Sequence, residues 1–257
     1  MQKDFPVFVS SADSYHDIWP VFFDLFKMHW PEYDGIIYLS TEEKVYDHEG
    51  LNIHCTQVGK LGSFGKIFRA GLDQVKSDHL LLMMIDYIFM SKVNDKNIRH
   101  YYNCFIELGF DSLLIIPSNF ETQTPTSFEK IKKVGLPVPH LFSYQIAFWK
   151  KGILYKMALP HENPWTSEWY GSTRANKMRI QLGCLSESVE TPILYDPHGC
   201  LDKGKWLNNA IEYLQKIDYP VDFKKRGIHE ELPQKFKERL KIKWMLVRDG
   251  LSGSYWK

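Results

Sequence analysis

The sequence of 257 residues has only four cysteines, Cys55, Cys104, Cys184 and Cys200, and none of them forms a CxxC pair. This spacing argues against a structural zinc site, and so few cysteines in a chain this long do not indicate a disulfide framework. No run of about 18 apolar residues occurs, so no membrane-spanning helix is expected. The first residues, MQKDFPVFVSSADSYHD, lack the apolar stretch of a secretory signal. Together these absences predict a cytoplasmic protein.

The chain also lacks an excess of charge of either sign, because 32 lysines and arginines face 31 aspartates and glutamates. Nucleic-acid-binding proteins usually show a clear basic excess, so the composition argues against nucleic acid as a partner. The balance is uneven along the chain, since residues 203–257 contain 13 basic and 7 acidic residues. That excess favours an anionic ligand or surface near this part, although a solvated helix face explains it about as well.

Two phosphate-binding motifs are missing, because no GxGxxG follows the first apolar run and no GxxxxGK[ST] occurs anywhere. What is present is an alternation of short apolar runs with amphipathic segments. The runs predict strands at 5–10, 35–39, 52–55, 79–85 and 111–116, and the segments between them predict helices at 15–30, 64–75 and 94–108. Strands that are apolar throughout, separated by amphipathic helices, indicate an α/β fold with a mostly parallel sheet and helices on both faces.

The pattern is less regular after residue 117. Residues 117–139 are expected to hold little regular structure except near 128–134. Strands are predicted at 142–149 and 191–195, and helices at 150–158, from 163, at 206–217 and at 232–247. We therefore expect an α/β domain over 1–205 and a C-terminal helical extension over 206–257 packed on it. The basic helix at 232–247 has an apolar stripe that is expected to dock on the domain; the alternative is peripheral contact with an anionic membrane.

Polar side chains follow several of the predicted strands. They are Ser10, Ser11, Asp13, Ser40, Thr41, Glu42 and Asp86. In a parallel sheet the strand ends meet at one edge, and ligands bind there beside a switch point in strand order. Asp86 ends the most apolar run of the chain, so it is expected to be poorly solvated and to need a cation, a metal or backbone donors. A loop cap is an equally common role for such a residue.

The segment HGCLDKGKW covers residues 198–206. Its glycines let the backbone approach a ligand, Lys203 and Lys205 supply positive charge, and a helix beginning at Trp206 would point N–H groups at an anion. His198 can ligate a metal or donate a hydrogen bond. Composition alone favours a diphosphate site and a solvated surface loop about equally.

The segment HENPWTSEWYGSTR covers residues 161–174. Glu162 and Glu168 are candidate general bases, because burial among aromatic rings raises the pKa of a carboxylate. Glu168 is preferred, since it lies within the predicted helix. Trp165 and Trp169 are four residues apart and are expected to pack on the same helix face. Arg174 either binds phosphate or pairs with an acid.

Four segments stand out together: SSADSYHDIWPVFFDLF at 10–26, Trp30-Pro31, IYLSTE at 37–42 and LMMIDYIF at 82–89. They resemble bacterial glycosyltransferase-like proteins of surface-polysaccharide gene clusters, which implies a GT-A, Rossmann-like domain. The acidic motif of that group, often Asp-x-Asp, falls on residues 85–87, where only Asp86 matches. The resemblance thus implies Mn²⁺ or Mg²⁺ as a cofactor with Asp86 as its ligand, although only one aspartate of the acidic motif is present. Residues 198–206 are similar to the His-x-x-Gly-x-x-Lys-Pro-Trp signature of glycogenin-like enzymes, in which the His binds metal and the Lys binds diphosphate.

The resemblance implies transfer of a sugar from a nucleotide-diphosphate donor to a saccharide or lipid-linked acceptor in bacterial surface polysaccharide synthesis. Nucleotide binding falls on Ser10, Ser11, Asp13, Thr41, Glu42 and Arg69. Diphosphate binding falls on His198, Lys203 and Lys205. Glu168 is the implied base and Asp86 the second catalytic residue. The acceptor set is Glu162, Trp165, Tyr170 and Arg174.

Two other readings stay open at this point. The incomplete acidic motif favours a non-catalytic nucleotide-sugar-binding or scaffold protein of the same fold. A nucleotidyltransferase is the weaker reading, because it would need two carboxylates for metal ions and a glycine-rich phosphate loop near the N-terminus.

Overall fold

A computed structural model describes residues 5–136 and 141–230 of the chain. The chain divides into two compact units, Met1–Cys200 and Leu201–Lys257. The division lies a few residues before the boundary expected between 205 and 206. The helix predicted at 232–247 lies outside the described residues, and so does the docking or membrane contact expected of it.

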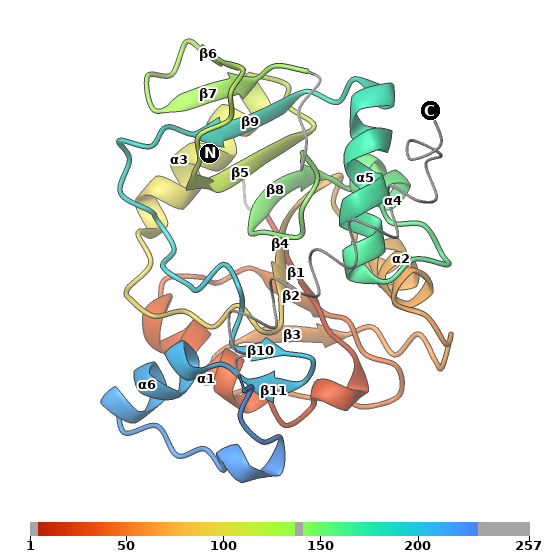
Figure 1. Cartoon of the computed structure of the whole chain (residues 1–257), viewed down its shortest axis with the longest axis vertical. Coiled ribbons are helices and arrows are strands. Elements are labelled where there is room, and N and C mark those ends of the chain that lie inside the picture. The colour runs from red at the N-terminus through yellow and green to blue at the C-terminus, as the bar shows by residue number, and fades with distance from the viewer. Residues whose placement is uncertain (1–4, 137–140, 231–257) are drawn as a thin grey trace, which may run out of the picture. The chain divides into compact units, whose positions relative to one another are not determined.

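The first unit holds a nine-stranded sheet with the order β3-β2-β1-β4-β8-β5-β9-β7-β6 (Figure 1). Its strands are β1 (Val7–Ser10), β2 (Ile36–Leu39), β3 (Asn52–Cys55), β4 (His79–Met84), β5 (Ser112–Pro117), β6 (Gln123–Pro125), β7 (Ile131–Val134), β8 (Ala147–Lys150) and β9 (Leu182–Leu185). In the described part of this sheet, β7 and β8 run opposite to the other strands. The mostly parallel sheet predicted from the sequence is therefore confirmed.

Helices cover both faces of the sheet. They are η1 (Asp13–Tyr15), α1 (Trp19–His29), α2 (Phe64–Gln74), α3 (Asp95–Glu107), α4 (Lys151–Met157) and α5 (Pro164–Met178). Successive side chains of a strand point to opposite faces. Phe8 of β1 meets Phe68 of α2 edge-on, with ring centroids 5.4 Å apart. Phe148 of β8 lies on the other face, where its ring contacts Tyr102 and Phe105 of α3. In Figure 1, α2, α4 and α5 accordingly group together, away from α3.

The strand predictions after residue 117 are partly wrong. Residues 123–125, expected to be irregular, form β6, which pairs with β7 inside the segment 128–134 where regular structure was expected; this hairpin adds to the sheet beside β9. The apolar run 191–195 is a loop in the structure. Its Ile193 and Tyr195 are buried, but its carbonyl groups accept hydrogen bonds from the segment 90–94 instead of a strand. The strand expected at 142–149 is confined to its end, 147–150.

The second unit begins with a hairpin of β10 (Leu201–Asp202) and β11 (Lys205–Trp206). Lys203 and Gly204 join the two strands with φ values of 50° and 78°, the positive values that both central residues of a tight type I′ turn require. The helix expected to begin at Trp206 instead begins later, as α6 (Asn208–Lys216), and η2 (Phe223–Lys225) follows it. Trp206 is buried against Phe223, with ring centroids 5.5 Å apart.

None of the helices in residues 5–136 and 141–230 combines the length and the apolar character that crossing a membrane requires.

Candidate functional site

The strand order reverses at β1 and β4. From β1 the chain moves outward through β2 and β3, and it then returns to place β4 on the other side of β1. Open α/β sheets bind their ligands outside the carboxyl ends of the strands at such a reversal. Here those ends carry Ser10 and Asp86, and they are joined by the hydrogen bond from Ile85 N to Ser10 O at 3.0 Å. The structure thus brings together two of the residues that the sequence singled out.

Asp86 is half-buried in the turn that follows β4. Burial raises the pKa of its carboxyl to about 6, and a hydrogen bond from its own backbone N–H opposes this only in part. Among the described residues, no lysine, arginine or histidine forms an ion pair with it. A carboxylate in this state is a candidate for chemistry, since unpaired buried charge is costly and is retained mainly where function needs it.

The turn at 196–200 covers Asp86. Cys200 N donates to Asp86 O at 2.7 Å, and a Cβ on Gly199 would lie 2.6 Å from Asp86 Oδ2. Gly199 also has a φ of +80°, so both its conformation and its close approach require glycine. His198, the residue before it, is exposed, and its backbone N–H donates to Asp196 Oδ1 at 2.8 Å. The first part of the predicted diphosphate segment therefore lies at Asp86.

Lys203 and Lys205, the other predicted diphosphate residues, belong to the second unit. Both are exposed on the β10–β11 hairpin. Arg226 adds a third cationic side chain there, because its Nη1 donates to Gly204 O at 3.4 Å. Their role toward a diphosphate stays a prediction.

Glu168 lies on α5, whose start the sequence placed correctly. Asn163 and Thr166 form a reciprocal capping box at its N-terminus, with Pro164 in the first turn. Glu168 Oε1 accepts a hydrogen bond of 2.7 Å from Tyr144 N. The side chain of Glu168 is half-buried, so one carboxylate oxygen is held in place by the backbone before β8.

The hydroxyl of Tyr87 is influenced by the charges of both Asp86 and Glu168. Burial first, and then the charges of Asp86, Tyr195 and Glu168, raise the pKa of its hydroxyl far above its ordinary value. Tyr87 was not among the site residues predicted from the sequence, because a tyrosine beside a strand-end aspartate forms no motif of its own. Its hydroxyl accepts a hydrogen bond of 3.0 Å from Gln145 Nε2, a contact between residues 58 positions apart in the sequence.

The aromatic residues of α5 are exposed. Trp165 is 67% exposed, Trp169 59% and Tyr170 57%. The expectation that Trp165 and Trp169 pack against the protein is therefore wrong. Ser167, Gly171 and Ala175 form the buried face instead, and a Cβ on Gly171 would lie 2.4 Å from the Phe142 ring. Glu168, three residues after Trp165 and one before Trp169, lies at the border of the exposed aromatic face.

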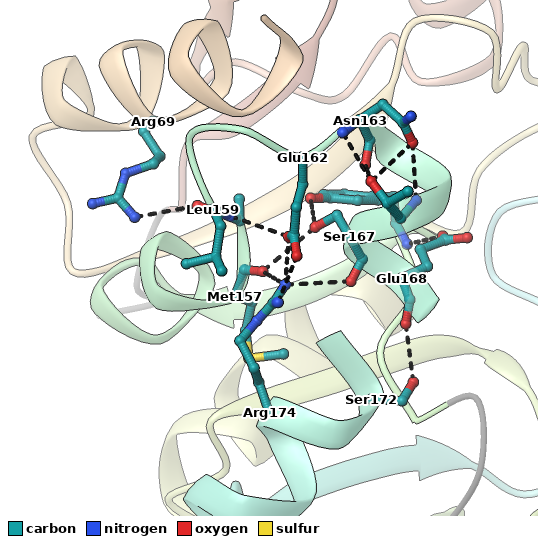
Figure 2. Close-up of polar contacts among 12 residues, drawn as sticks. Arg69, Met157, Leu159, Glu162, Asn163, Ser167, Glu168, Ser172 and Arg174 are labelled. Atoms are coloured by element: carbon teal, nitrogen blue, oxygen red, sulfur yellow. Dashed lines mark hydrogen bonds and ion pairs between the residues drawn. The ribbon is translucent and has the colours of Figure 1, made fainter. Parts of the chain in front are cut away.

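Glu162 and Arg174, predicted to bind the acceptor, pair with each other (Figure 2). Arg174 Nη1 donates to Glu162 Oε1 at 2.7 Å, and Nη2 donates to Glu162 Oε2 and to Met157 O, each at 2.6 Å. Glu162 is 5% exposed. This geometry favours the second reading given for Arg174, that it pairs with an acid, and it joins the end of α4 to α5.

Arg69, predicted to bind the nucleotide, reaches the end of α4 instead. Its Nη1 donates to Tyr155 O at 3.1 Å and to Ala158 O at 3.2 Å, and the guanidinium stacks 3.8 Å from the centroid of the Tyr155 ring. A cation at the carbonyl end of a helix is stabilising. The contacts of Arg69 are therefore structural ones.

The predicted nucleotide-binding residues near β1 and β2 tie the loops of this sheet edge together. Asp13 Oδ1 accepts from Glu42 N, and Oδ2 accepts from Glu43 N and Lys44 N, at 2.9–3.0 Å. Glu42 Oε2 in turn accepts from Asp13 N at 3.2 Å. Their role toward a nucleotide stays a prediction.

Two further members of that set are also engaged within the protein. Ser11 Oγ accepts from Trp19 Nε1 at 2.8 Å. Thr41 is fully buried, and its hydroxyl accepts from Gln57 N at 3.0 Å. Ser11 therefore lies beside the β1–β4 edge with its oxygen already in use, and Thr41 is inside the protein.

Asp13→Ala is expected to lower the free energy of unfolding by about 1–3 kcal/mol, because it leaves backbone amides without their charged acceptor. Desolvation pushes the pKa of Asp13 upward, but the three amides and the Lys44 charge outweigh it, so the folded-state pKa is lowered. This stabilisation is present above the ordinary value of 3.8 and is lost as the pH falls through the folded-state pKa. Urea unfolding of both proteins at pH 7 and near pH 2 measures it.

The matched control is Asp73→Ala, an exposed aspartate on α2 whose loss should change stability by about 0.5 kcal/mol or less. Equal effects of the two substitutions at pH 7 would contradict the assigned role of Asp13.

A divalent metal, implied by the family resemblance, normally takes several oxygen or nitrogen ligands from its protein. In the described ranges, no three His, Cys, Asp or Glu side chains come together in a way that could hold one. Asp86 is a single carboxylate, so this donor set does not fit a metal held by the protein alone.

No protein-family model and no curated protein matches this chain. Among solved structures, S. aureus TarS 1–349 is similar with a TM-score of 0.46 and 16% identity over 73% of this chain and 59% of that one. A longer S. aureus TarS structure is similar with a TM-score of 0.45 and 15% identity, over 73% of this chain and 36% of that one. The structure of a 4-diphosphocytidyl-2C-methyl-D-erythritol synthase is similar with a TM-score of 0.38 and 10% identity, over 77% of this chain and 95% of that one. The chain thus spans 59% and 36% of the two TarS structures. TM-scores below 0.5 at 10–16% identity do not by themselves indicate a function.

Proposed function

We propose that this protein is a glycosyltransferase that moves a sugar from a nucleotide-diphosphate donor to a saccharide or lipid-linked acceptor. The observation that carries the proposal is the placement of Asp86 at the β1–β4 reversal, covered by Gly199, with both Asp86 and Glu168 within electrostatic range of Tyr87. Two carboxylates held apart around one buried side chain suit a reaction that needs one of them as a base. The resemblance to surface-polysaccharide glycosyltransferases supports the same substrate class and pathway.

The proposed reaction assigns one step to each group. The acceptor hydroxyl oxygen attacks the anomeric carbon, the bond from that carbon to the phosphate oxygen breaks, and the nucleoside diphosphate leaves with the electron pair. Glu168 takes the acceptor proton. Asp86 stabilises the positive charge that develops on the sugar as the bond breaks. The departing diphosphate needs a cationic partner, a role for which the sequence alone proposes Lys203 and Lys205, and one well-placed contact of this kind is worth about 2.7–4 kcal/mol of barrier.

The exposed aromatic face of Trp165 and Trp169 is the proposed acceptor site. The two indoles are about one helical turn apart. Glu168 lies between them in the sequence, at the edge of the exposed face that is nearer the buried side of the helix. Indole rings offer a flat apolar surface and a polar N–H, which suits the mixed apolar and hydroxylated faces of a sugar ring. An acceptor stacked there would present a hydroxyl to Glu168.

Glu168→Gln tests the proposal, because it keeps the shape of the side chain and removes the base. We expect transfer to fall by about 10²- to 10⁴-fold, while donor binding is retained. Product formation measured by chromatography and donor affinity measured by calorimetry separate the two effects. The matched control is Glu187→Gln, which makes the same carboxylate-to-amide change at an exposed residue outside the site. Unchanged turnover in Glu168→Gln would overturn the assignment of the base.

A non-catalytic nucleotide-sugar-binding protein is the second candidate. It is favoured by one observation, that no group of metal-binding side chains accompanies Asp86 in the described part of the chain. Donor hydrolysis and transfer assayed with and without Mn²⁺ or Mg²⁺ distinguish the two, because a binding protein releases no nucleoside diphosphate under either condition.

A further inference from the structure

A directed chain of hydrogen bonds ends at the hydroxyl of Tyr87. It begins at Ile146 N, which donates to Tyr195 Oη at 3.3 Å. Tyr195 Oη lies 2.8 Å from Gln145 Oε1 and donates its single proton there, because an amide oxygen only accepts. The first links are therefore fixed in direction, and they hold the oxygen side of the Gln145 amide toward Tyr195.

The nitrogen side of the same amide faces two acceptors. Gln145 Nε2 donates to Pro197 O at 3.0 Å and to Tyr87 Oη at 3.0 Å. The Pro197 carbonyl can only accept, which confirms that this side of the amide is the nitrogen. Both Nε2 hydrogens are then in use. Tyr87 Oη consequently receives a hydrogen bond from Gln145, and its own proton must point elsewhere.

The proton of Tyr87 has no acceptor among the described residues of the unit, although the side chain is only 7% exposed. A buried donor without an acceptor costs about 1–3 kcal/mol. The hydrogen-bond chain is held by three separate segments, since Tyr87 follows β4, Gln145 precedes β8, and Tyr195 and Pro197 lie where the loop 191–195 enters the turn that covers Asp86. Such an arrangement presents one donor in a fixed direction to a ligand that supplies the missing oxygen.

The charges around Tyr87 restrict which kind of oxygen atom a ligand can place beside its hydroxyl. Asp86 and Glu168 both lie within electrostatic range of the Tyr87 hydroxyl. Their carboxylates repel a phosphate oxygen, whereas a neutral alcohol can accept from Tyr87 and donate to a carboxylate. A sugar ring carries such alcohols on neighbouring carbons. The transferred sugar must also lie between the leaving diphosphate and the base, which is the region that Asp86 and Glu168 flank.

We propose that Tyr87 donates a hydrogen bond to a ring hydroxyl of the sugar that is transferred, and so determines which sugar the protein accepts. Gln145 and Tyr195 are positioning residues that fix the direction of this donor. The inference rests on the proposed function, because it requires a nucleotide-sugar donor.

The test compares the affinity for a nucleotide sugar with that for its bare nucleoside diphosphate. Calorimetry of the full chain with UDP-, GDP- and CDP-linked hexoses, and with UDP, GDP and CDP, first identifies the bound pair. Tyr87→Phe is then expected to weaken nucleotide-sugar binding about fivefold to tenfold and to leave nucleoside diphosphate binding unchanged. Among hexose epimers of the preferred donor, the wild-type preference for one epimer should also shrink by the same factor.

Tyr195→Phe gives a second, independent readout. It removes the link that orients Gln145, so the same selective loss for the nucleotide sugar should appear in smaller measure. Tyr101→Phe, which alters a buried tyrosine on α3, is the matched control and should change neither affinity. A purely structural role for Tyr87 would lower both affinities or neither, together with the melting temperature.

Each outcome decides one point. If the wild-type protein binds nucleotide sugars more tightly than nucleoside diphosphates and Tyr87→Phe keeps that difference, the inference is overturned and the proposed function stands. If the wild-type protein binds none of these nucleotide sugars, the proposed function fails and the inference fails with it.

Discussion

Asp86→Asn is expected to lower sugar transfer by about 10²- to 10³-fold and, at the same time, to stabilise the fold at neutral pH. Both effects have one cause, the burial that raises the pKa of the Asp86 carboxyl from 3.8 to about 6. The native state holds the proton more tightly than the unfolded chain does, so wild-type stability falls as the pH rises from about 4 to 6. Above pH 6 the full cost, roughly 3 kcal/mol, is present. The neutral asparagine does not incur it.

The measurement is urea unfolding of both proteins at intervals from pH 4 to pH 8. The variant should equal the wild type near pH 4 and exceed it by up to roughly 3 kcal/mol at pH 7–8. Asp73→Asn, on an exposed face of α2, should show no such pH-dependent difference. A gap between Asp86→Asn and wild type that is the same at pH 4 and pH 8 would contradict the pKa assignment.

The loss of transfer in the same variant is expected at about 10²- to 10³-fold, the range seen when one preorganised electrostatic contact to a transition state is removed. A substitution that raises stability while it removes activity is the signature of a functional residue, because structural residues lose both together. Asp86 would then be distinguished from the loop-capping role that the sequence left open.

The sheet and the position of Asp86 could be predicted because both depend on local sequence. β1, β2, β4 and β5 are apolar runs, and the parallel order brings their carboxyl ends to one edge whatever the details of packing. The start of α5 was equally local, since Asn163, Pro164 and Thr166 are neighbours in the chain.

β9 was not predicted because its composition is atypical of a strand. Its residues LGCL include Gly183, where a Cβ would lie 2.4 Å from the Phe110 ring. Glycine is present because the ring needs the space, which is a tertiary reason that the segment itself does not reveal.

The orientation of α5 shows the same limit. The i,i+4 spacing of Trp165 and Trp169 is compatible with a buried or an exposed face, since periodicity names a face without saying what covers it. The informative signal was the line of small residues Ser167, Gly171 and Ala175, which permits close approach of Phe142. The Glu162–Arg174 pair and the Tyr87–Gln145 contact depend on residues far apart in the chain, and no local pattern indicates them.

Arg174→Met should destabilise the protein more than any other substitution considered for α5, by about 3–5 kcal/mol. The pair it breaks is nearly excluded from water, since the side chain of Glu162 is 5% exposed and that of Arg174 20%. Removal of the cation leaves the Glu162 carboxylate buried with little beyond a weak contact from Leu159 N at 3.4 Å. An uncompensated buried charge costs far more than the pair contributes, because most of the Coulomb gain offsets desolvation.

A double substitution separates these two quantities. Glu162→Gln combined with Arg174→Met removes both charges, so it should recover much of the loss and keep the transfer activity, since α5 still presents Glu168. Lys177→Met, an exposed change on the same helix, is the control for the methionine itself. Urea unfolding at pH 7 ranks the four proteins. If Arg174→Met and Lys177→Met lower the free energy of unfolding by the same small amount, the Glu162–Arg174 pair does not hold α4 to α5. The prediction that Glu162 and Arg174 bind the acceptor would then be favoured again.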